Sequence, residues 1–152
     1  MNFFAQQVYK LRASPFFPCK EEKMEEILQQ FTLDYFGRGK HKTTPEALLE
    51  TGNALLLDVR SQEEAESLAI SLAFHENVKC LNIPIHEMPD RIGEIPKGKA
   101  IGVFCPANVR STLVYAFLLM RGFEDVRIVV GGYAALTEAL MPGKLLKKTQ
   151  AR

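Results

Sequence analysis

Four apolar runs, separated by segments with helical spacing, constrain the fold of this chain more than any other feature. The runs comprise residues 54–59, 79–83, 99–104 and 126–130. The first, Ala54-Leu55-Leu56-Leu57-Asp58-Val59, is nearly continuous, which is typical of a strand buried on both faces. Helical patterns lie after or between the runs, at residues 61–73, 86–92, 110–121 and 133–140. Alternation of strands and helices predicts an α/β fold with a parallel sheet.

Local signals mark the ends of these segments. Thr44 followed by Pro45 predicts a helix start, with threonine as the N-cap and proline at the first helical position. Ser61 with Glu64 three residues later is the pattern of a capping box. Gly122 ends one helical pattern, and the pair Gly131-Gly132 separates the last apolar run from the last helix.

Residues 1–42 differ in character from the rest, and we interpret them as an N-terminal extension to a domain spanning 43–152. Aromatic residues gather around two prolines near the start, namely Phe3, Phe4, Phe16, Phe17, Pro15 and Pro18. Residues 21–36 predict one helix, whose apolar stripe is Met24, Ile27, Leu28, Phe31 and Tyr35. An apolar stripe has to be covered, so we expect this helix to pack on the main domain or on a second subunit.

Composition excludes several classes of protein. The hydrophobic fraction is 47%, the charged fraction is 24% and the net charge is +1, which are the values of an ordinary globular domain without a nucleic-acid or membrane-surface partner. The first residues of the chain have neither the positive n-region nor the apolar run of a signal peptide, so we expect none, and no transmembrane run occurs in the sequence. Its three cysteines, Cys19, Cys80 and Cys105, form no CxxC pair and leave one over in any disulfide scheme, which indicates a reducing, cytoplasmic environment.

Cys105 is the residue most in need of a chemical explanation. It ends the apolar run 99–104, and a helical segment opens five residues later at Arg110-Ser111. In open parallel sheets, sites lie at the carboxyl ends of strands. A helix N-terminus and a nearby cation stabilise an anion and lower a thiol pKa from about 8.5 to between about 3.5 and 7.5. The surroundings of Cys105 therefore predict a nucleophilic thiolate.

Four short motifs, in order along the chain, resemble those of the rhodanese-like sulfurtransferase family. They are Leu57-Asp58-Val59-Arg60 with Glu64, then Leu81-Asn82-Ile83-Pro84, then Val103-Phe104-Cys105 with Arg110-Ser111, and finally Val130-Gly131-Gly132-Tyr133-Ala134-Ala135-Leu136. The resemblance covers about residues 43 to 141. It implies a rhodanese-like parallel sheet of about five strands flanked by helices, with an extra short strand near 40–43, and a catalytic Cys105 that carries a persulfide.

Two departures from the family pattern affect the site. The segment 69–78 replaces a Gly-His-Ile-Pro-Gly-Ala-like stretch, which changes one wall of the pocket. Asn108 stands where many members have glycine, and asparagine tolerates a positive φ better than most residues. We therefore expect the turn to be kept, with a more crowded rim.

The resemblance implies a double displacement. Cys105 would take sulfane sulfur from thiosulfate or another persulfide donor and pass it to cyanide, a small thiol or a protein acceptor, with neither metal nor organic cofactor. Cys105 and Arg110 are the candidate catalytic residues. The candidate anion cradle is made of Pro106, Ala107, Asn108, Val109 and Ser111. We interpret Asp58, Arg60, Glu64, Gly131 and Gly132 as structural support, with Asp58 bonding loop backbone, Arg60 pairing with Glu64, and the two glycines permitting the turn.

Three alternatives stay open at this point. The domain could be a binding or regulatory module that keeps the cysteine without turnover and uses residues 1–42 as its partner surface. It could be a cysteine-dependent phosphatase or arsenate reductase, although the four residues between Cys105 and Arg110 are one fewer than the phosphatase loop has. Cys19 could resolve a persulfide at Cys105, whereas Cys80 lies in a predicted buried strand. The histidines His41, His75 and His86 show no metal-ligand spacing with any cysteine.

Overall fold

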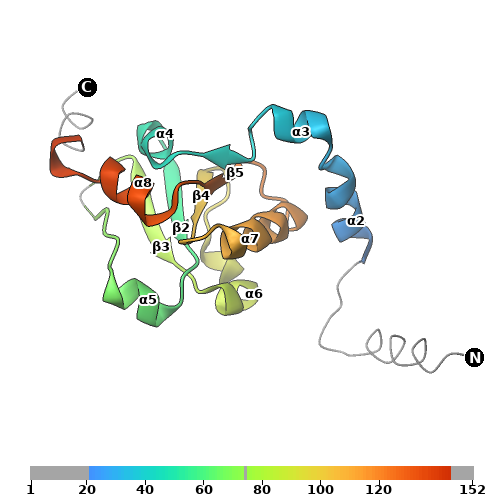
Figure 1. The fold of residues 1–152 in the computed structure, drawn as a ribbon. Coiled ribbons are helices and arrows are strands. Elements are labelled where there is room, and N and C mark those ends of the chain that lie inside the picture. The colour runs from blue at the N-terminus through green and yellow to red at the C-terminus, as the bar shows by residue number, and fades with distance from the viewer. Residues whose placement is uncertain (1–20, 74, 145–152) are drawn as a thin grey trace, which may run out of the picture.

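The computed structural model describes residues 21–73 and 75–144. Its centre is a five-stranded sheet in the order β1-β5-β4-β2-β3, with every neighbouring pair parallel (Figure 1). The strands are β1 (Lys42–Thr43), β2 (Ala54–Asp58), β3 (Val78–Asn82), β4 (Ala100–Phe104) and β5 (Val126–Val129). The predicted α/β fold and the expected short extra strand are confirmed.

The most apolar runs of the sequence form the interior strands. Every residue of β2 and of β4 is buried, as expected for strands that are covered on both faces. Their register places Asp58 beside both Phe104 and Asn82, so three strands end at the same level. Cys105 follows Phe104 directly and therefore lies at the carboxyl edge of the sheet.

Helices cover both faces of the sheet (Figure 1). One face packs against α7 (Val109–Met120) and three short helices, namely η1 (Ile85–Glu87), α6 (Met88–Arg91) and η2 (Ile92–Glu94). The other packs against α4 (Pro45–Glu50) and α8 (Gly132–Ala139). Gly102 allows the close approach of α4, because a Cβ there would stand 2.5 Å from a methyl carbon of Leu48. None of the helices in these described ranges is long and apolar enough to cross a bilayer.

The N-terminal helix predicted over 21–36 is in fact two helices, α2 (Glu21–Gln30) and α3 (Leu33–Gly37). The break is at Thr32, which has extended backbone and accepts a hydrogen bond from the Tyr35 amide at 3.2 Å, as an N-cap does. The segment packs on α7: the rings of Phe31 and Tyr115 stack at 6.2 Å, and the hydroxyls of Tyr35 and Tyr115 are hydrogen-bonded. Part of the predicted apolar stripe packs on the main domain: Ile27 is buried, and Phe31 and Tyr35 are partly buried against the core, whereas Met24 and Leu28 are exposed.

The helix predicted over 61–73 is also shorter than expected, because α5 spans only Gln62–Ser67. Its start is confirmed: the Glu64 amide donates to Ser61 Oγ, and the Ser61 amide donates to Glu64 Oε2 at 2.9 Å. At the other end, Arg60 Nη1 donates to the carbonyls of Glu64 and Leu68 at 3.2 and 3.1 Å. The Glu64 carbonyl also accepts from the Leu68 amide, whereas the Leu68 carbonyl is one that a longer helix would pair with its own amides and that Arg60 satisfies instead. The early aromatic cluster and Cys19 lie outside the described residues.

Candidate functional site

Cys105 lies in a closed loop between β4 and α7. Its side chain is buried, with 1% of the residue exposed. Its Sγ accepts a hydrogen bond from the Ser111 amide at 3.3 Å and lies 3.4 Å from Ser111 Oγ. Ser111 is in the first turn of α7, so the loop 105–111 curls back and directs a helix N-terminus at the sulfur. The structure thus brings together the cysteine and the helix start that the sequence suggested.

The loop owes its shape to Asn108. This residue has φ 61°, and within the described ranges it is the only residue other than glycine with a positive φ. The expectation that asparagine would keep the turn is therefore confirmed. Its carbonyl accepts from Ser111 Oγ at 3.0 Å and from Thr112 Oγ1 at 2.7 Å. Because Ser111 Oγ donates to Asn108, its lone pairs face the thiol of Cys105. Pro106, Ala107 and Val109 complete the loop, and Ala107 and Val109 are exposed.

The Arg110 guanidinium is bound by a carboxylate. Its Nη1 and Nη2 atoms lie 2.5 and 2.9 Å from the two carboxylate oxygens of Glu64, a fork-to-fork pair. The Arg110 hydrogen bonds, together with the Ser61 amide, lower the pKa of Glu64 to about 2. The bond to Glu64 in turn raises the pKa of Arg110, with smaller electrostatic contributions from Cys105 and Tyr133. The hydrogen bonds that the structure shows for the Arg110 guanidinium therefore go to Glu64 and not to the sulfur.

The predicted pairing of Arg60 with Glu64 is wrong. Arg60 is fully buried and pairs with Asp58, whose Oδ2 accepts from Nη2 at 2.6 Å. Asp58 Oδ1 also accepts from the Arg60 amide at 3.1 Å, so Asp58 bonds loop backbone as expected. Arg60 meets Glu64 through the latter's main-chain carbonyl alone. The carboxylate of Glu64 remains available to Arg110 as a result.

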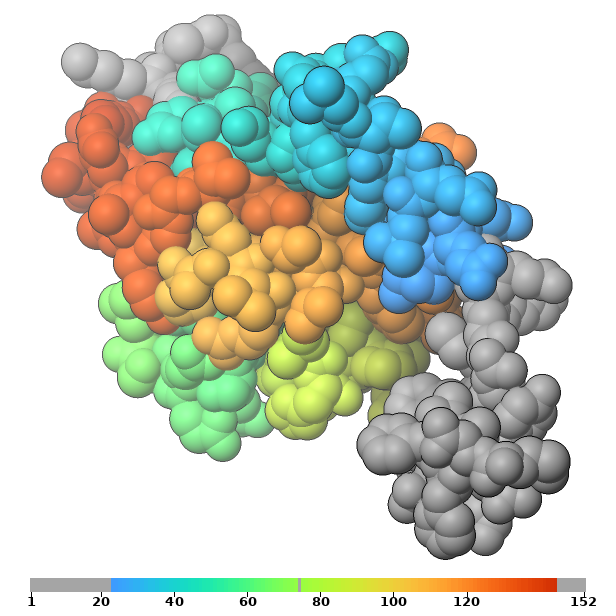
Figure 2. All heavy atoms as spheres, turned by 45° about the vertical axis from the view of Figure 1, so that its right-hand side comes forward, coloured from blue at the N-terminus to red at the C-terminus, as the bar shows by residue number. Residues whose placement is uncertain are grey.

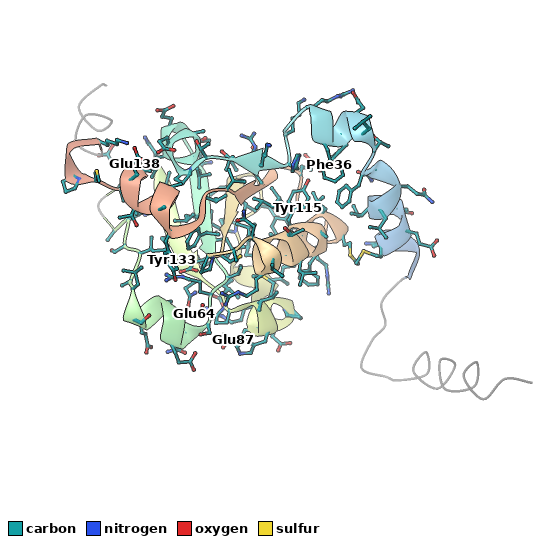
Figure 3. All side chains as sticks on the ribbon, in the orientation of Figure 1. Phe36, Glu64, Glu87, Tyr115, Tyr133 and Glu138 are labelled. Atoms are coloured by element: carbon teal, nitrogen blue, oxygen red, sulfur yellow. The ribbon has the colours of Figure 1, made fainter. Side chains whose placement is uncertain are left out.

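Two residues that the sequence reasoning did not single out complete the support of the loop. Tyr133 Oη accepts from Arg60 Nη1 at 3.0 Å, and its ring packs edge-on to Phe104 with centroids 5.7 Å apart. The side-chain amide of Asn82 donates through Nδ2 to the backbone carbonyls of Asp58 and Arg60 at 3.0 and 3.2 Å. Asn82 lies in the Leu81–Pro84 motif and Tyr133 in the Val130–Leu136 motif, so these two motifs are the sequence signal that could have identified them. In Figure 3, Tyr133 and Glu64 lie close to the start of α7.

The pair Gly131-Gly132 forms the turn beside the loop, as predicted. Their φ values are +93° and +56°, in the region that favours glycine. A Cβ on Gly132 would stand 2.5 Å from the carbonyl oxygen of Pro106. The start of α8 is therefore packed directly against the loop, and the gold start of α7 lies at the surface between orange-red α8 and green α5 (Figure 2).

The remaining cysteine and histidine candidates lie apart from the loop. Burial raises the pKa of Cys80, in β3, to about 11. His75 is buried, and its Nδ1 accepts from the amides of Asn77 and Val78 at 3.3 and 3.2 Å, which is a structural role. His41 stacks on the ring of Tyr35 and meets the ring of Phe36 edge-on, and His86 is exposed. In the described part of the chain, no three histidine, cysteine or acidic side chains gather where they could hold a metal ion.

Comparison with known proteins gives a consistent family assignment. The family model described as the rhodanese-like domain matches residues 43–139. A sulfurtransferase of Allochromatium vinosum is 30% identical over 95 residues, which cover 62% of this chain and 82% of that protein. A tRNA sulfurtransferase of Sodalis glossinidius is 31% identical over 84 residues, which cover 55% of this chain but 17% of that enzyme. A rhodanese-related protein from Thermoplasma volcanium superposes with a TM-score of 0.54 at 25% identity, over 67% of this chain and 95% of that one.

Proposed function

The chain belongs to the rhodanese-like domain family, and from this premise we propose that it is a sulfurtransferase in which Cys105 carries sulfane sulfur as a persulfide. One observation supports this proposal most directly: Cys105 Sγ lies at the carboxyl end of a central strand and accepts a hydrogen bond from the first turn of α7. That environment stabilises an anionic sulfur, which both the thiolate and its persulfide are.

The first half-reaction loads the enzyme. The Cys105 thiolate attacks the outer sulfur of a donor such as thiosulfate, and a new S–S bond forms at Sγ. The S–S bond of thiosulfate breaks, and sulfite leaves with the electron pair. The product is a Cys105 persulfide, whose outer sulfur carries the negative charge. The Ser111 amide contacts Sγ before the reaction and the start of α7 faces it, so both stabilise the attacking thiolate without reorganising.

The second half-reaction removes the outer sulfur from the Cys105 persulfide. A nucleophile attacks the outer sulfur, and Cys105 leaves as the thiolate that began the cycle. Cyanide gives thiocyanate, a small thiol gives its persulfide, and a cysteine of a protein acceptor gives a protein persulfide. Splitting one transfer in two in this way needs one well-stabilised thiolate and no redox partner. We propose the reducing cytoplasm as the compartment, because the cycle requires Cys105 to return to the thiolate.

The remaining members of the loop have roles in shape. Asn108 turns the backbone, Pro106 lies against Gly132, and the Asp58–Arg60 pair joins the end of β2 to α5 and α8. We propose that these residues keep the loop closed around the sulfur, and that Ala107 and Val109, which are exposed, meet the donor or acceptor.

Intact-protein mass spectrometry tests the proposal. The reduced protein is exposed briefly to thiosulfate, beside Cys105→Ser and the matched control Cys80→Ser. We expect the wild type and Cys80→Ser to gain the mass of one sulfur atom and to lose it again when cyanide or a thiol is added. We expect Cys105→Ser to gain no mass. If thiosulfate fails, the test is repeated with an alkyl persulfide. Absence of sulfur on the wild type with both donors would overturn the sulfurtransferase proposal.

A further inference from the structure

Both arginines beside the active loop are neutralised by carboxylates. Arg60 is paired with Asp58 in the interior, and Arg110 is paired with Glu64 at the surface. The second pair is the one that a dissolved anion can reach, because its side chains keep 32% and 39% of their surface exposed. The cation at the start of α7, Arg110, is therefore accompanied by the negative charge of Glu64.

Glu64 is held in this position from two sides. Arg110 donates two hydrogen bonds to it, and the Ser61 amide donates a third through the capping box of α5. The side chain of Glu64 is therefore fixed by its own helix start as well as by Arg110. The pair joins α5 to the first turn of α7, the helix that follows the loop of Cys105.

The consequence concerns the charge of the donor. A free guanidinium at this position would attract an anion in proportion to the charge that the anion carries. With Glu64 in contact, an approaching anion meets attraction and repulsion from nearly the same distance, and the two largely cancel. A dianion loses about twice as much attraction as a monoanion.

We propose that Glu64, by neutralising Arg110, sets the charge class of the sulfur donor and makes the site favour weakly charged donors over the thiosulfate dianion. This inference rests on the proposed function. Glu64 is a positioning residue in this scheme, because it contacts Arg110 and not the reacting sulfur. The favoured class comprises monoanionic sulfane-sulfur compounds.

Two donors differ in charge while delivering the same sulfur. Thiosulfate is a dianion, and loading Cys105 from it releases sulfite. Methanethiosulfonate is a monoanion, and the same attack of the thiolate on its outer sulfur forms the same persulfide and releases methanesulfinate. Because the two leaving groups differ in reactivity, the informative quantity is the ratio of variant to wild-type kcat/KM for each donor, with cyanide as the common acceptor.

The variant is Glu64→Gln, which keeps an amide oxygen for the Ser61 N–H, as glutamine does in capping boxes. We expect kcat/KM to rise about threefold for methanethiosulfonate and about tenfold for thiosulfate, since doubling the charge doubles the logarithm of the effect. The gain for thiosulfate should shrink as salt is added. Two control variants should leave the ratio of kcat/KM for the two donors unchanged. Glu66→Gln removes a negative charge from α5 at a residue that does not contact Arg110. Glu64→Asp keeps the negative charge beside Arg110.

A double variant locates the effect at Arg110. Arg110→Gln alone leaves the Glu64 charge uncompensated, so kcat/KM should fall more for thiosulfate than for methanethiosulfonate; the double variant Arg110→Gln/Glu64→Gln removes both charges and should return the ratio of kcat/KM for the two donors toward the wild-type value. Equal changes for both donors in Glu64→Gln, or a ratio of kcat/KM for the two donors that Arg110→Gln leaves at the wild-type value, would overturn the inference while leaving sulfur transfer intact. If the wild type takes sulfur from neither donor nor from an alkyl persulfide, the proposed function fails, and the inference fails with it.

Discussion

Gly132→Ala tests the claim that the start of α8 supports the active loop. Gly132 has φ +56°, and a left-handed conformation costs an alanine roughly 1–2 kcal/mol. The added Cβ would also stand 2.5 Å from the carbonyl oxygen of Pro106, which forces the loop or the helix to move. Overpacking of that kind costs about 1–3 kcal/mol, so the total loss of stability should be about 2–5 kcal/mol.

Gly122→Ala separates the two contributions. Gly122 has φ +81°, and no described atom lies within 4 Å of the position of its Cβ. This variant should lose only the conformational part, roughly 1–2 kcal/mol. The free energy of unfolding is measured by urea titration at constant m-value. Equal losses in Gly132→Ala and Gly122→Ala would refute the contact with Pro106 as a constraint on the loop.

Gly131→Ala separates stability from activity. Its Cβ would overlap Ala135 within α8, so it strains the same turn without reaching Pro106. Both turn variants should be destabilised. At a temperature where each is folded, the rate of sulfur loading on Cys105 should fall at least about tenfold in Gly132→Ala and far less in Gly131→Ala, because a modest displacement of a catalytic group can cost up to a hundredfold.

Three further predictions follow from buried or paired groups. Asp58→Ala leaves Arg60, which is fully buried, without its counter-charge and should cost about 3–5 kcal/mol in urea unfolding; a loss below about 1 kcal/mol would contradict the role of the pair. Glu64 has a folded-state pKa of about 2 against 4.5, so its stabilising effect should be complete above pH 4.5 and disappear as the pH falls toward 2; the wild-type minus Glu64→Gln difference, at most about 1 kcal/mol for a pair this exposed, should shrink over that range and stay flat above it. Burial raises the pKa of Cys80 from 9.0 to about 11, so its alkylation by iodoacetamide at pH 8 should be about a hundredfold slower in the native protein than after unfolding, as followed by peptide mass spectrometry; equal rates would show that Cys80 is accessible and ionised.

Local features of the chain were predictable because their causes lie within a few residues. The buried strands follow from continuous apolar runs, the start of α5 from Ser61 and Glu64, and the turn at Asn108 from the tolerance of asparagine for positive φ. The parallel order and the place of Cys105 at a strand end follow from strand–helix alternation, and the five-stranded count follows from the family resemblance.

The ion pairs were not predictable in the same way. Arg60 and Glu64 are four apart and look like neighbours on a helix, but Arg60 precedes the N-cap and is not part of α5. Its guanidinium therefore turns inward to Asp58. The true partner of Glu64, Arg110, is 46 positions away and reaches it only because the sheet order brings the ends of β2 and β4 together. Similarly, the break at Thr32 depends on a polar N-cap whose preference outweighs a continuous apolar stripe.

The buried Arg60 guanidinium links three elements that are distant in sequence. It binds Asp58 at the end of β2, the carbonyls that terminate α5, and the hydroxyl of Tyr133 in α8. Since one planar group holds all three, none can open without breaking bonds to the others. Backbone amides of α5 and α8 should therefore exchange with solvent hydrogen in a single cooperative opening, so that both helices open at the same rate.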